Sequence, residues 1–304
     1  MSAEPSSGLK LLRCIGHCQW LPLGVRDRII RRFVSPGTSP LAFEADFFGL
    51  LYPGSLASYI DWSVYFFGCY EPRLIELITG LGVVLAPRTV LDIGANAGHH
   101  TLVLSRHAQA VHAFEPYELV RGQLQAKVAR NALGHVTVHP FAVGGRRERL
   151  QFYAPTSGNL GTGSLLVGHA RENNTRVTEI EVIGGDDYVR EQGIRDIDLI
   201  KIDVEGYEHE VLLGIRATIA AQRPVVIMEF SDESKERFGS AEKFLGLWPE
   251  HYLAYFVDET GRHYRLRDLD FAADEGNVLM MPEETHPRLK GLRFSDAAAK
   301  GVTV

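Results

Sequence analysis

The stretch VLDIGANAGHHTL, from Val90 to Leu102, decides which fold this chain of 304 residues adopts. Its first residues are apolar, as in a strand that is buried on both faces, and the pattern from Ala97 to His107 is that of a helix. Gly94 and Gly98 lie where the strand turns into the helix, so a ligand can approach the backbone there without meeting a Cβ atom, with helix-terminal N–H groups pointing at it. The stretch therefore predicts a strand, a ligand-binding loop and a helix in succession.

Strand and helix patterns alternate along the residues that follow. Because parallel strands need connecting helices on the faces of the sheet, this order predicts an α/β fold with a Rossmann-like, doubly wound, mostly parallel sheet. Residues 252–257 and 278–281 are predicted to close the sheet as an antiparallel pair. The other strands are predicted at 110–115, 136–143, 197–202 and 225–230, and further helices at 117–131 and 236–247.

Residues 146–183 interrupt this alternation. Gln151, Phe152 and Tyr153 on one side, and alternating apolar residues at 177–182 on the other, flank a segment rich in Gly, Ser, Thr and Asn at 156–164. Such a pattern is typical of two antiparallel strands with a long connection. We therefore expect an inserted β-hairpin here.

The residues around the glycine loop indicate which ligand it binds. Glu115 follows Gly94 by 21 residues and ends the next predicted strand, where a carboxylate can hold both hydroxyls of a ribose. Asn96 stands where the dinucleotide pattern has its second glycine, so an adenosine without phosphates fits better than a pyrophosphate. Asp92 suits a ligand that carries an ammonium group. Together these residues favour S-adenosylmethionine over NAD.

A second cluster of acidic residues follows the strand at 197–202. Asp203 lies at the carboxyl end of that strand, across from the glycine loop, and Glu205 is close to it in sequence. Either carboxylate could orient a substrate hydroxyl or receive its proton. Glu205, with Glu208, also suits the positive end of a helix. The histidines that could serve as a base are His99, His100 and His209, and the sequence does not single out one of the candidate bases.

Glu229 ends the apolar strand at 225–230 and needs a partner if it is buried. Asp203 and Glu229 would lie at adjacent strand ends. Two alternatives follow: the two carboxylates share a cation such as Mg²⁺, or they hydrogen-bond a sugar-like substrate.

The order of these motifs resembles the FkbM-type S-adenosylmethionine-dependent methyltransferases. This resemblance implies a class I methyltransferase fold and O-methylation of a hydroxyl on a small molecule, sugar or glycan. It implies that Asp203 and Glu205 face the methyl-transfer site, and that the cofactor is bound by a set that includes Ala142 from the Ala142–Gly144 motif. Gly184 and Gly185 depart from the family, which more often has Thr-Leu there. The resemblance rests on residues 67–72, 90–98, 114–116, 131, 142–144, 186–188, 201–208 and 229, and the implied cofactor set is Asp92, Gly94, Asn96, Gly98, Glu115 and Ala142.

The chain is expected to divide into an amino-terminal appendage at 1–86, a methyltransferase domain at 87–283 and a flexible tail at 284–304. The appendage would contain a basic helical segment and an aromatic-rich hairpin that turns at Pro53–Gly54. Residues 1–40 carry six basic and two acidic residues, so their net charge is +4 and that of the remainder is −10. Weak contact of residues 9–32 with a membrane surface is one interpretation, and a solvated helix face is the one we favour.

Composition narrows the remaining function classes. A net charge of −6 argues against a dedicated nucleic-acid partner. No apolar run reaches the about 20 residues that span a bilayer, the amino terminus lacks a signal-peptide core, and three cysteines are too few for a disulfide framework, so a cytoplasmic protein is expected. Two alternatives to methyl transfer remain: a nicotinamide-dependent oxidoreductase and a non-catalytic binding module. The sequence leaves the oligomeric state open.

Overall fold

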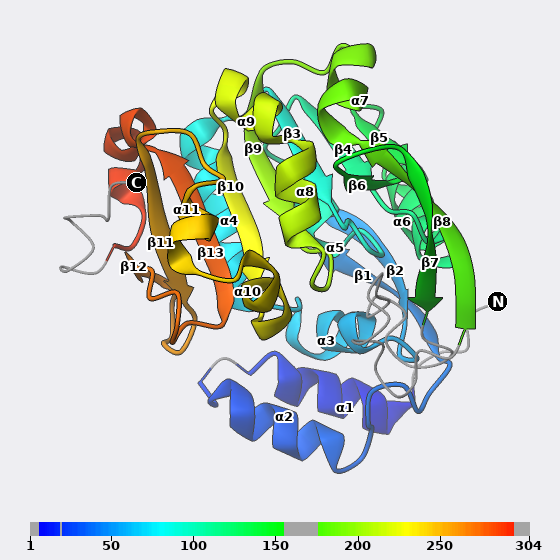
Figure 1. Cartoon of the computed structure of the whole chain (residues 1–304). Helices are drawn as coiled ribbons and strands as arrows, with labels where there is room; N and C mark the ends of the chain where they lie inside the picture. Colours follow the sequence, from blue (N-terminus) through cyan, green and yellow to red (C-terminus); the bar gives the residue numbers. More distant parts are fainter. Residues whose placement is uncertain (1–5, 19, 155–175, 295–304) are drawn as a thin grey trace.

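A twisted eight-stranded sheet forms the centre of the molecule in the computed structural model, which describes residues 6–18, 20–154 and 176–294 (Figure 1). The first five strands in spatial order from one edge run parallel, and the last strand along the chain lies antiparallel to both of its neighbours. This arrangement confirms the predicted doubly wound sheet and its antiparallel closing strand. The spatial order is β5 (Val136–His139), β4 (Ala110–Phe114), β3 (Thr89–Ile93), β9 (Ile197–Ile202), β10 (Val225–Phe230), β13 (Gly276–Pro282), β11 (Tyr252–Asp258) and β12 (Arg265–Asp268).

Alternate residues of the central strands feed two separate cores, one on each face of the sheet. In β3, Val90 belongs to one core while Leu91 and Ile93 belong to the other. The central strands are therefore mostly apolar, because both of their faces are buried. One face is covered by α4 (Pro72–Leu85), α5 (His99–Ser105) and α6 (Glu118–Arg130), and the other by α7 (Gly185–Glu191), α8 (Glu208–Gly214), α9 (Arg216–Gln222), α10 (Asp232–Phe238) and α11 (Ala241–Leu245).

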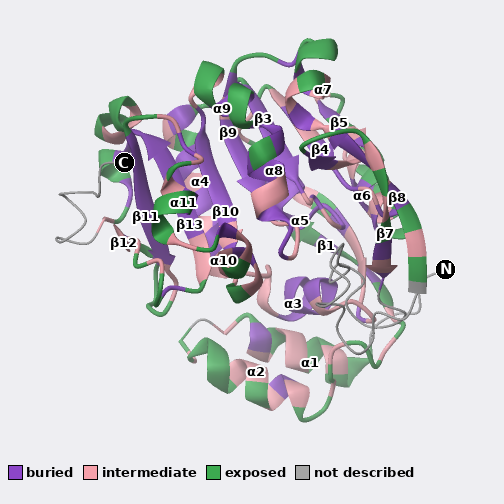
Figure 2. Cartoon of the chain, viewed as in Figure 1, coloured by how far each residue is buried: buried purple, intermediate pink, exposed green. Residues whose placement is uncertain are grey.

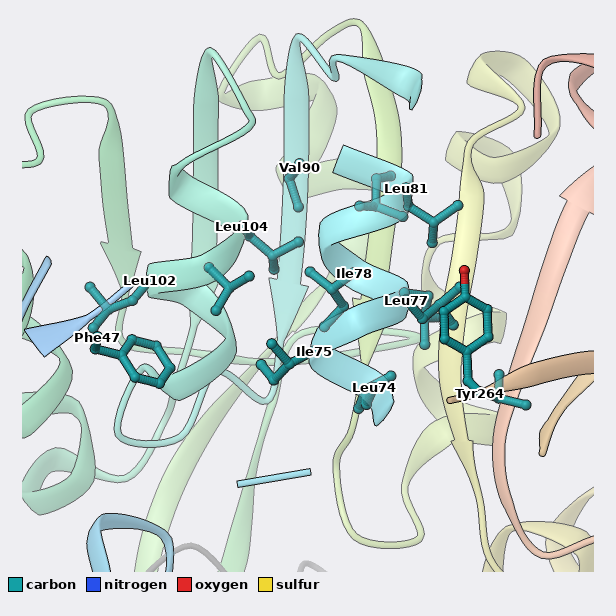
Figure 3. Close-up of a cluster of buried hydrophobic side chains, with 14 of the residues drawn as sticks. Phe47, Leu74, Ile75, Leu77, Ile78, Leu81, Val90, Leu102, Leu104 and Tyr264 are labelled. Carbon is teal, nitrogen blue, oxygen red and sulfur yellow. The ribbon is translucent and has the colours of Figure 1, made fainter. Parts of the chain in front are cut away.

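Helix α4 anchors the amino-terminal part of the chain to the sheet. Its leucine and isoleucine side chains recur at helical spacing and are buried against β3 and α5. Figure 3 shows this cluster, with Leu74, Ile75, Leu77, Ile78 and Leu81 of the helix beside Phe47, Val90, Leu102, Leu104 and Tyr264. The predicted boundary between residues 86 and 87 stays a prediction, and the segments on either side of it share one core.

The amino-terminal hairpin turns at a different place from the predicted one. Strands β1 (Ala42–Phe47) and β2 (Leu50–Ser55) are joined by Phe48 and Gly49, whose φ angles are +54° and +81°. Two positive φ angles are what a two-residue hairpin turn needs. Pro53 instead lies within β2, opposite Glu44, which a two-stranded sheet tolerates because each strand has one edge without a ladder partner. The hairpin is confirmed, and the Pro53–Gly54 turn is wrong.

Two other predicted elements are divided in the structure. The strand predicted at 136–143 is split into β5 and β6 (Ala142–Gly144), because Pro140 has no N–H group with which to continue the ladder. The helix predicted at 236–247 is split into α10 and α11, because Gly239 takes a φ of +77°. Strand β6 does not join the large sheet and pairs with the inserted hairpin.

The inserted hairpin is confirmed as β7 (Glu148–Ala154) and β8 (Arg176–Gly184), which form a three-stranded sheet with β6. The predicted loop at 156–164 lies outside the described residues. In the predicted tail, a 3₁₀ helix, η1 (Glu283–Gly291), packs near α4 and buries Leu289, while residues 295–304 are not described.

Three more helices, α1 (Ser7–Gly16), α2 (Leu23–Arg31) and α3 (Tyr59–Phe67), form a layer at one end of the sheet. Helix α3 is almost entirely buried, whereas most residues of α1 and α2 are exposed or half-buried (Figure 2). Within the part of the chain that the structure describes, no helix has the length and apolar character needed to cross a membrane.

Candidate active site

A cavity of about 230 Å³ lies at the carboxyl ends of β3, β4, β9 and β10, where the strand order reverses. Three separate stretches of the chain line it: one around α3 and the start of α4, one from β3 to β8, and one from β9 to β13. Seven of the predicted site residues face this cavity, namely Gly94, Asn96, Glu115, Ala142, Asp203, Glu205 and Glu229. Asp92 and Gly98 do not line it, and His209 lies outside it, beside Glu210.

The glycine loop is built tightly against the loop that follows β9. Gly94 has a φ of +81°, and a Cβ atom placed on it would lie 1.8 Å from the backbone oxygen of Asp203. Gly98 has a φ of +87°, and a Cβ there would lie 2.5 Å from the Leu124 side chain. Gly94 is therefore required by its contact with the backbone, and Gly98 is favoured by its positive φ, in addition to the open approach that the sequence suggested.

The N–H groups of the loop are already used within the protein. Those of Gly94 and Ala95 are donated to the Phe114 carbonyl at 3.1 and 3.0 Å. That of Asn96 is donated to Glu115, and those of Ala97 and Gly98 to groups of the loop itself. The expectation that loop N–H groups point at a ligand is thus not met for residues 94–98. A phosphate needs such free donors, so the loop suits a ligand without phosphates.

A buried lysine also binds the glycine loop. Lys127 of α6 donates to the Ala97 carbonyl at 2.9 Å, and its Nζ atom lies 3.9 Å from Asp61 of α3 and 4.4 Å from the centre of the Tyr52 ring. Burial lowers the pKa of Lys127, and the Asp61 carboxylate acts in the opposite direction. Through this lysine the amino-terminal helices and hairpin are connected to the glycine loop.

Glu115 is held in place by two backbone N–H groups at the end of β4. Its Oε2 accepts from Asn96 at 3.0 Å and its Oε1 from Tyr117 at 2.8 Å. Burial raises the pKa of Glu115 to about 7, although both hydrogen bonds act to lower it. The carboxylate is fixed at the cavity wall and retains acceptor capacity, because each carboxylate oxygen can accept two hydrogen bonds.

A buried lysine that the sequence analysis did not single out lies at the centre of the site. Lys201 donates to Asp203 Oδ2 at 3.0 Å, and its Nζ lies 4.0 Å from Asp92 Oδ1. Burial alone would lower the pKa of Lys201, but the carboxylates of Asp203 and Asp92 raise it. Asp92 also accepts from Thr101 at 2.6 Å. Asp92 therefore contacts the site through Lys201.

Two acidic side chains at the far end of the cavity are favoured in their protonated form. Burial, followed by the negative charge of Asp203, raises the pKa of Glu229 to about 10 and that of Glu71 to about 8. Glu229 Oε2 is buried without a hydrogen-bond partner among the described residues. Glu71 lies 3.4 Å from His100 Nε2, and burial lowers the pKa of His100. Glu71 is not among the site residues expected from the sequence, although it stands in the motif Tyr70-Glu71-Pro72.

The predicted Mg²⁺ site at Asp203 and Glu229 is not supported. Among the described residues, no group of three or more His, Cys, Asp or Glu side chains is arranged to hold a metal ion. Lys201 places a positive charge 3.0 Å from Asp203, which is the role that a cation would have had. Glu229 keeps its proton at neutral pH because its pKa is raised to about 10. The negative charge of Asp203 is thus balanced by Lys201, and that of Glu229 is removed by its own proton.

The loop after β9 is shaped by Glu208, which is completely buried. Its Oε1 accepts from the Val204 N–H at 3.0 Å, and its Oε2 accepts from the Ser234 hydroxyl at 2.5 Å. Glu205 takes a φ of +53° in this loop and faces the cavity. Among the candidate bases, His99 lines the cavity but lies 3.0 Å from the Tyr70 carbonyl, and burial lowers its pKa to about 3.

The raised pKa of Glu229 gives an expected pH dependence of stability. The unfolded chain releases this proton above about pH 4.5, whereas the folded protein holds it up to about 10, so unfolding is favoured as the pH rises. Between about pH 7 and 8.5 the buried histidines are neutral in both states, and the loss is about 1.4 kcal/mol per pH unit for one group. Thermal unfolding should show this decline, and Glu229→Gln should reduce its slope. Equal slopes in the two proteins would contradict the assignment.

Comparison with known proteins places these features in a family context. The model of the family described as the methyltransferase FkbM domain matches residues 92–266. Among curated proteins, the chain is 27% identical over 200 residues to the AMB antimetabolite synthetase AmbE of Pseudomonas aeruginosa, covering 52% of this chain and 9% of that protein. It is 28% identical over 159 residues to the 2-O-methyltransferase NoeI of Sinorhizobium fredii, covering 47% of this chain and 63% of that one. The chain thus spans less than two thirds of the length of either relative.

Similar solved structures include the methyltransferase FkbM from Methylobacillus flagellatus, with 18% identity, a TM-score of 0.43, and coverage of 64% of this chain and 44% of that one. An O-methyltransferase from Bacillus cereus matches with 14% identity and a TM-score of 0.39, covering 70% of this chain and 82% of that one.

Proposed function

The chain belongs to the FkbM methyltransferase family, and on that premise we propose that it transfers the methyl group of S-adenosylmethionine to a hydroxyl of a small molecule, sugar or glycan. The observation that carries this proposal is the cavity itself, which has Glu115 beside the glycine loop at one end and Asp203, Glu205 and Glu229 at the other. One end suits the adenosine of a cofactor, and the other suits an acceptor that donates hydrogen bonds.

The residues present fit S-adenosylmethionine. Glu115 offers acceptor oxygens to ribose hydroxyls. Tyr117 OH is buried without a hydrogen-bond partner among the described residues, and its ring lies in the wall of the cavity. An unpartnered buried hydroxyl is costly unless a ligand completes it. The loop lacks free N–H groups for a pyrophosphate, which favours this cofactor over a nicotinamide dinucleotide and so disfavours the oxidoreductase alternative.

The bound cofactor supplies an electrophilic methyl group on a sulfonium, and the protein positions the acceptor. Asp203 is held by Lys201 and can accept the hydrogen bond of an acceptor hydroxyl, orient it and receive its proton. Glu229, protonated at neutral pH, has an oxygen free to hydrogen-bond a neighbouring group of the acceptor. Glu205 is the second candidate for the role of Asp203. Transfer to oxygen is supported by the likeness to a 2-O-methyltransferase.

The proposal predicts that Glu115→Gln weakens S-adenosylmethionine binding by about 1.5 to 3 kcal/mol, or about 10- to 150-fold, because a charged acceptor is replaced by an amide. Titration calorimetry measures the dissociation constants. Glu118→Gln, an exposed residue three positions later, is the matched control and should bind as the wild type does.

A methyl-labelled donor offered with sugars, lipids and cell extracts then identifies the acceptor, and mass spectrometry of the product distinguishes a methyl ether from a methylated amine. Binding of NAD in place of S-adenosylmethionine, or a wild-type affinity of folded Glu115→Gln, would contradict the cofactor assignment. A methylated amine as the only product would contradict O-methylation.

A further inference from the structure

Helices α1 and α2 form the outermost layer of the amino-terminal part of the chain. We call them and their flanks, residues 7–34, the amino-terminal helix pair. The two helices lie side by side, and α1 also packs on α3, whose Ile60 lines the cavity (Figure 1). The pair therefore lies on the cavity side of the molecule, separated from the cavity by a single helix. Its inner side contributes Leu9, Leu12 and Ile30 to the core.

The amino-terminal helix pair exposes several large apolar side chains. Among the described residues, four large apolar side chains are more than 60% exposed, and three of them belong to this pair: Trp20 at 81%, Phe33 at 72% and Leu11 at 63%. Leu23 and Val25 are also exposed. Single exposed apolar residues are ordinary, but such a concentration in one short segment indicates a contact surface.

The same segment is basic in an otherwise acidic protein. Residues 6–34 contain six basic residues and one acidic residue, Asp27, whose carboxylate is paired with Arg31 at 2.7 Å. Arg28 and Arg32 are exposed, and they follow Val25 by three and seven positions, so the three side chains lie on one face of α2 and just beyond its end. Arg13, Arg26 and Arg31 lie over aromatic rings of the protein, whereas the exposed residues of the pair include both apolar side chains and the positive charges of Arg28 and Arg32.

We propose that the amino-terminal helix pair docks on a lipid bilayer surface that carries anionic headgroups. Tryptophan prefers the interface between water and lipid, and basic residues are attracted to anionic lipids. Both kinds of group are needed because neither alone gives stable binding. In a dimer formed through this surface, the positive charges of one copy would face those of the other, and their repulsion disfavours self-association. An acidic protein would complement the positive charge of the pair. A bilayer does so too, and it also offers a hydrocarbon layer into which Trp20 and Phe33 can insert.

The test uses the full chain and co-flotation with vesicles. Wild type should float with vesicles of phosphatidylcholine containing phosphatidylglycerol and should bind vesicles of phosphatidylcholine alone much more weakly. Arg28→Gln with Arg32→Gln should weaken binding by about 25-fold, since each basic residue near the surface contributes about fivefold. Trp20→Ser with Phe33→Ser should weaken it by roughly tenfold or more. Val83→Ser, which changes a residue of α4 that is 66% exposed, is the control and should float as the wild type does.

All substituted side chains are exposed, and circular dichroism checks that each variant is folded. Three results would overturn the proposal: wild type fails to float with anionic vesicles, both double variants float as well as wild type, or Val83→Ser loses binding to the same extent. Light scattering measures the oligomeric state and so distinguishes a lipid surface from a second copy of the chain. A wild-type dimer that Trp20→Ser with Phe33→Ser converts to a monomer would assign the surface to a second copy and overturn the lipid assignment.

Discussion

Asp203→Asn is expected to lower kcat by about 10² to 10⁴-fold, the usual contribution of a positioned general base, while the affinity for S-adenosylmethionine stays near that of the wild type. The amide keeps the shape of the side chain and can still accept from Lys201, but it cannot take a proton from the acceptor. Asp203 faces the cavity and lies across the sheet switch point from Glu115, so the cofactor end is left intact. Product formation by mass spectrometry gives kcat, and calorimetry gives the affinity.

Two further variants make this result specific. Asp187→Asn changes an exposed carboxylate that pairs with Arg190 away from the cavity, and it should turn over as the wild type does. Glu205→Gln tests the second candidate in the same loop. If Asp203→Asn is fully active and Glu205→Gln is not, Glu205 is the base, and the role of Asp203 is to balance the charge of Lys201.

Gly94→Ala is expected to abolish measurable cofactor binding and to lower the free energy of unfolding by roughly 2 kcal/mol or more. Any other residue is strained at a φ of +81°, and the new Cβ would meet the Asp203 backbone oxygen at 1.8 Å. Because the obstacle is backbone, no side chain can rotate away to relieve it. The loops after β3 and β9 would have to separate, which disturbs both ends of the cavity.

Gly122→Ala is the matched control, since this glycine lies in α6 with nothing within 4 Å of an added Cβ. It should leave cofactor binding unchanged and raise stability by about 0.5 to 1 kcal/mol, as expected for alanine in a helix. Chemical denaturation and calorimetry measure the two quantities. A Gly94→Ala protein as stable as wild type, with intact binding, would show that the loops can move apart without cost.

The parallel sheet and its antiparallel closing pair could be predicted from the sequence because buried parallel strands are mostly apolar and are separated by helical patterns. The family resemblance is also confirmed. It could be recognised because its motifs lie at the ends of these strands. Errors arose where one residue stops an element. Pro140 ends β5, Gly239 ends α10, and Phe48 forms the hairpin turn without being a usual turn residue.

The candidate site was harder to predict because its charges are balanced by residues that look unremarkable in sequence. Lys201 stands within an apolar strand, and only the fold shows that it lies between Asp92 and Asp203. Glu71 precedes Asp203 by more than a hundred residues, so no local pattern joins them. The Mg²⁺ alternative is not supported, because the sequence reveals two neighbouring carboxylates but not the buried ammonium of Lys201 beside Asp203.

Lys127 limits which amino-terminal stretches of related proteins can replace that of this chain in a chimera. The family match begins at residue 92, yet Ile60, Tyr70 and Glu71 form part of the cavity wall, so a transplanted amino-terminal stretch changes the lining of the cavity. The transplant must also supply a carboxylate in the place of Asp61, because a buried ammonium left without its counter-charge is strongly destabilising. A relative is therefore suitable as the source of the amino-terminal stretch when it has an acidic residue at the position of Asp61, and its overall sequence identity matters less.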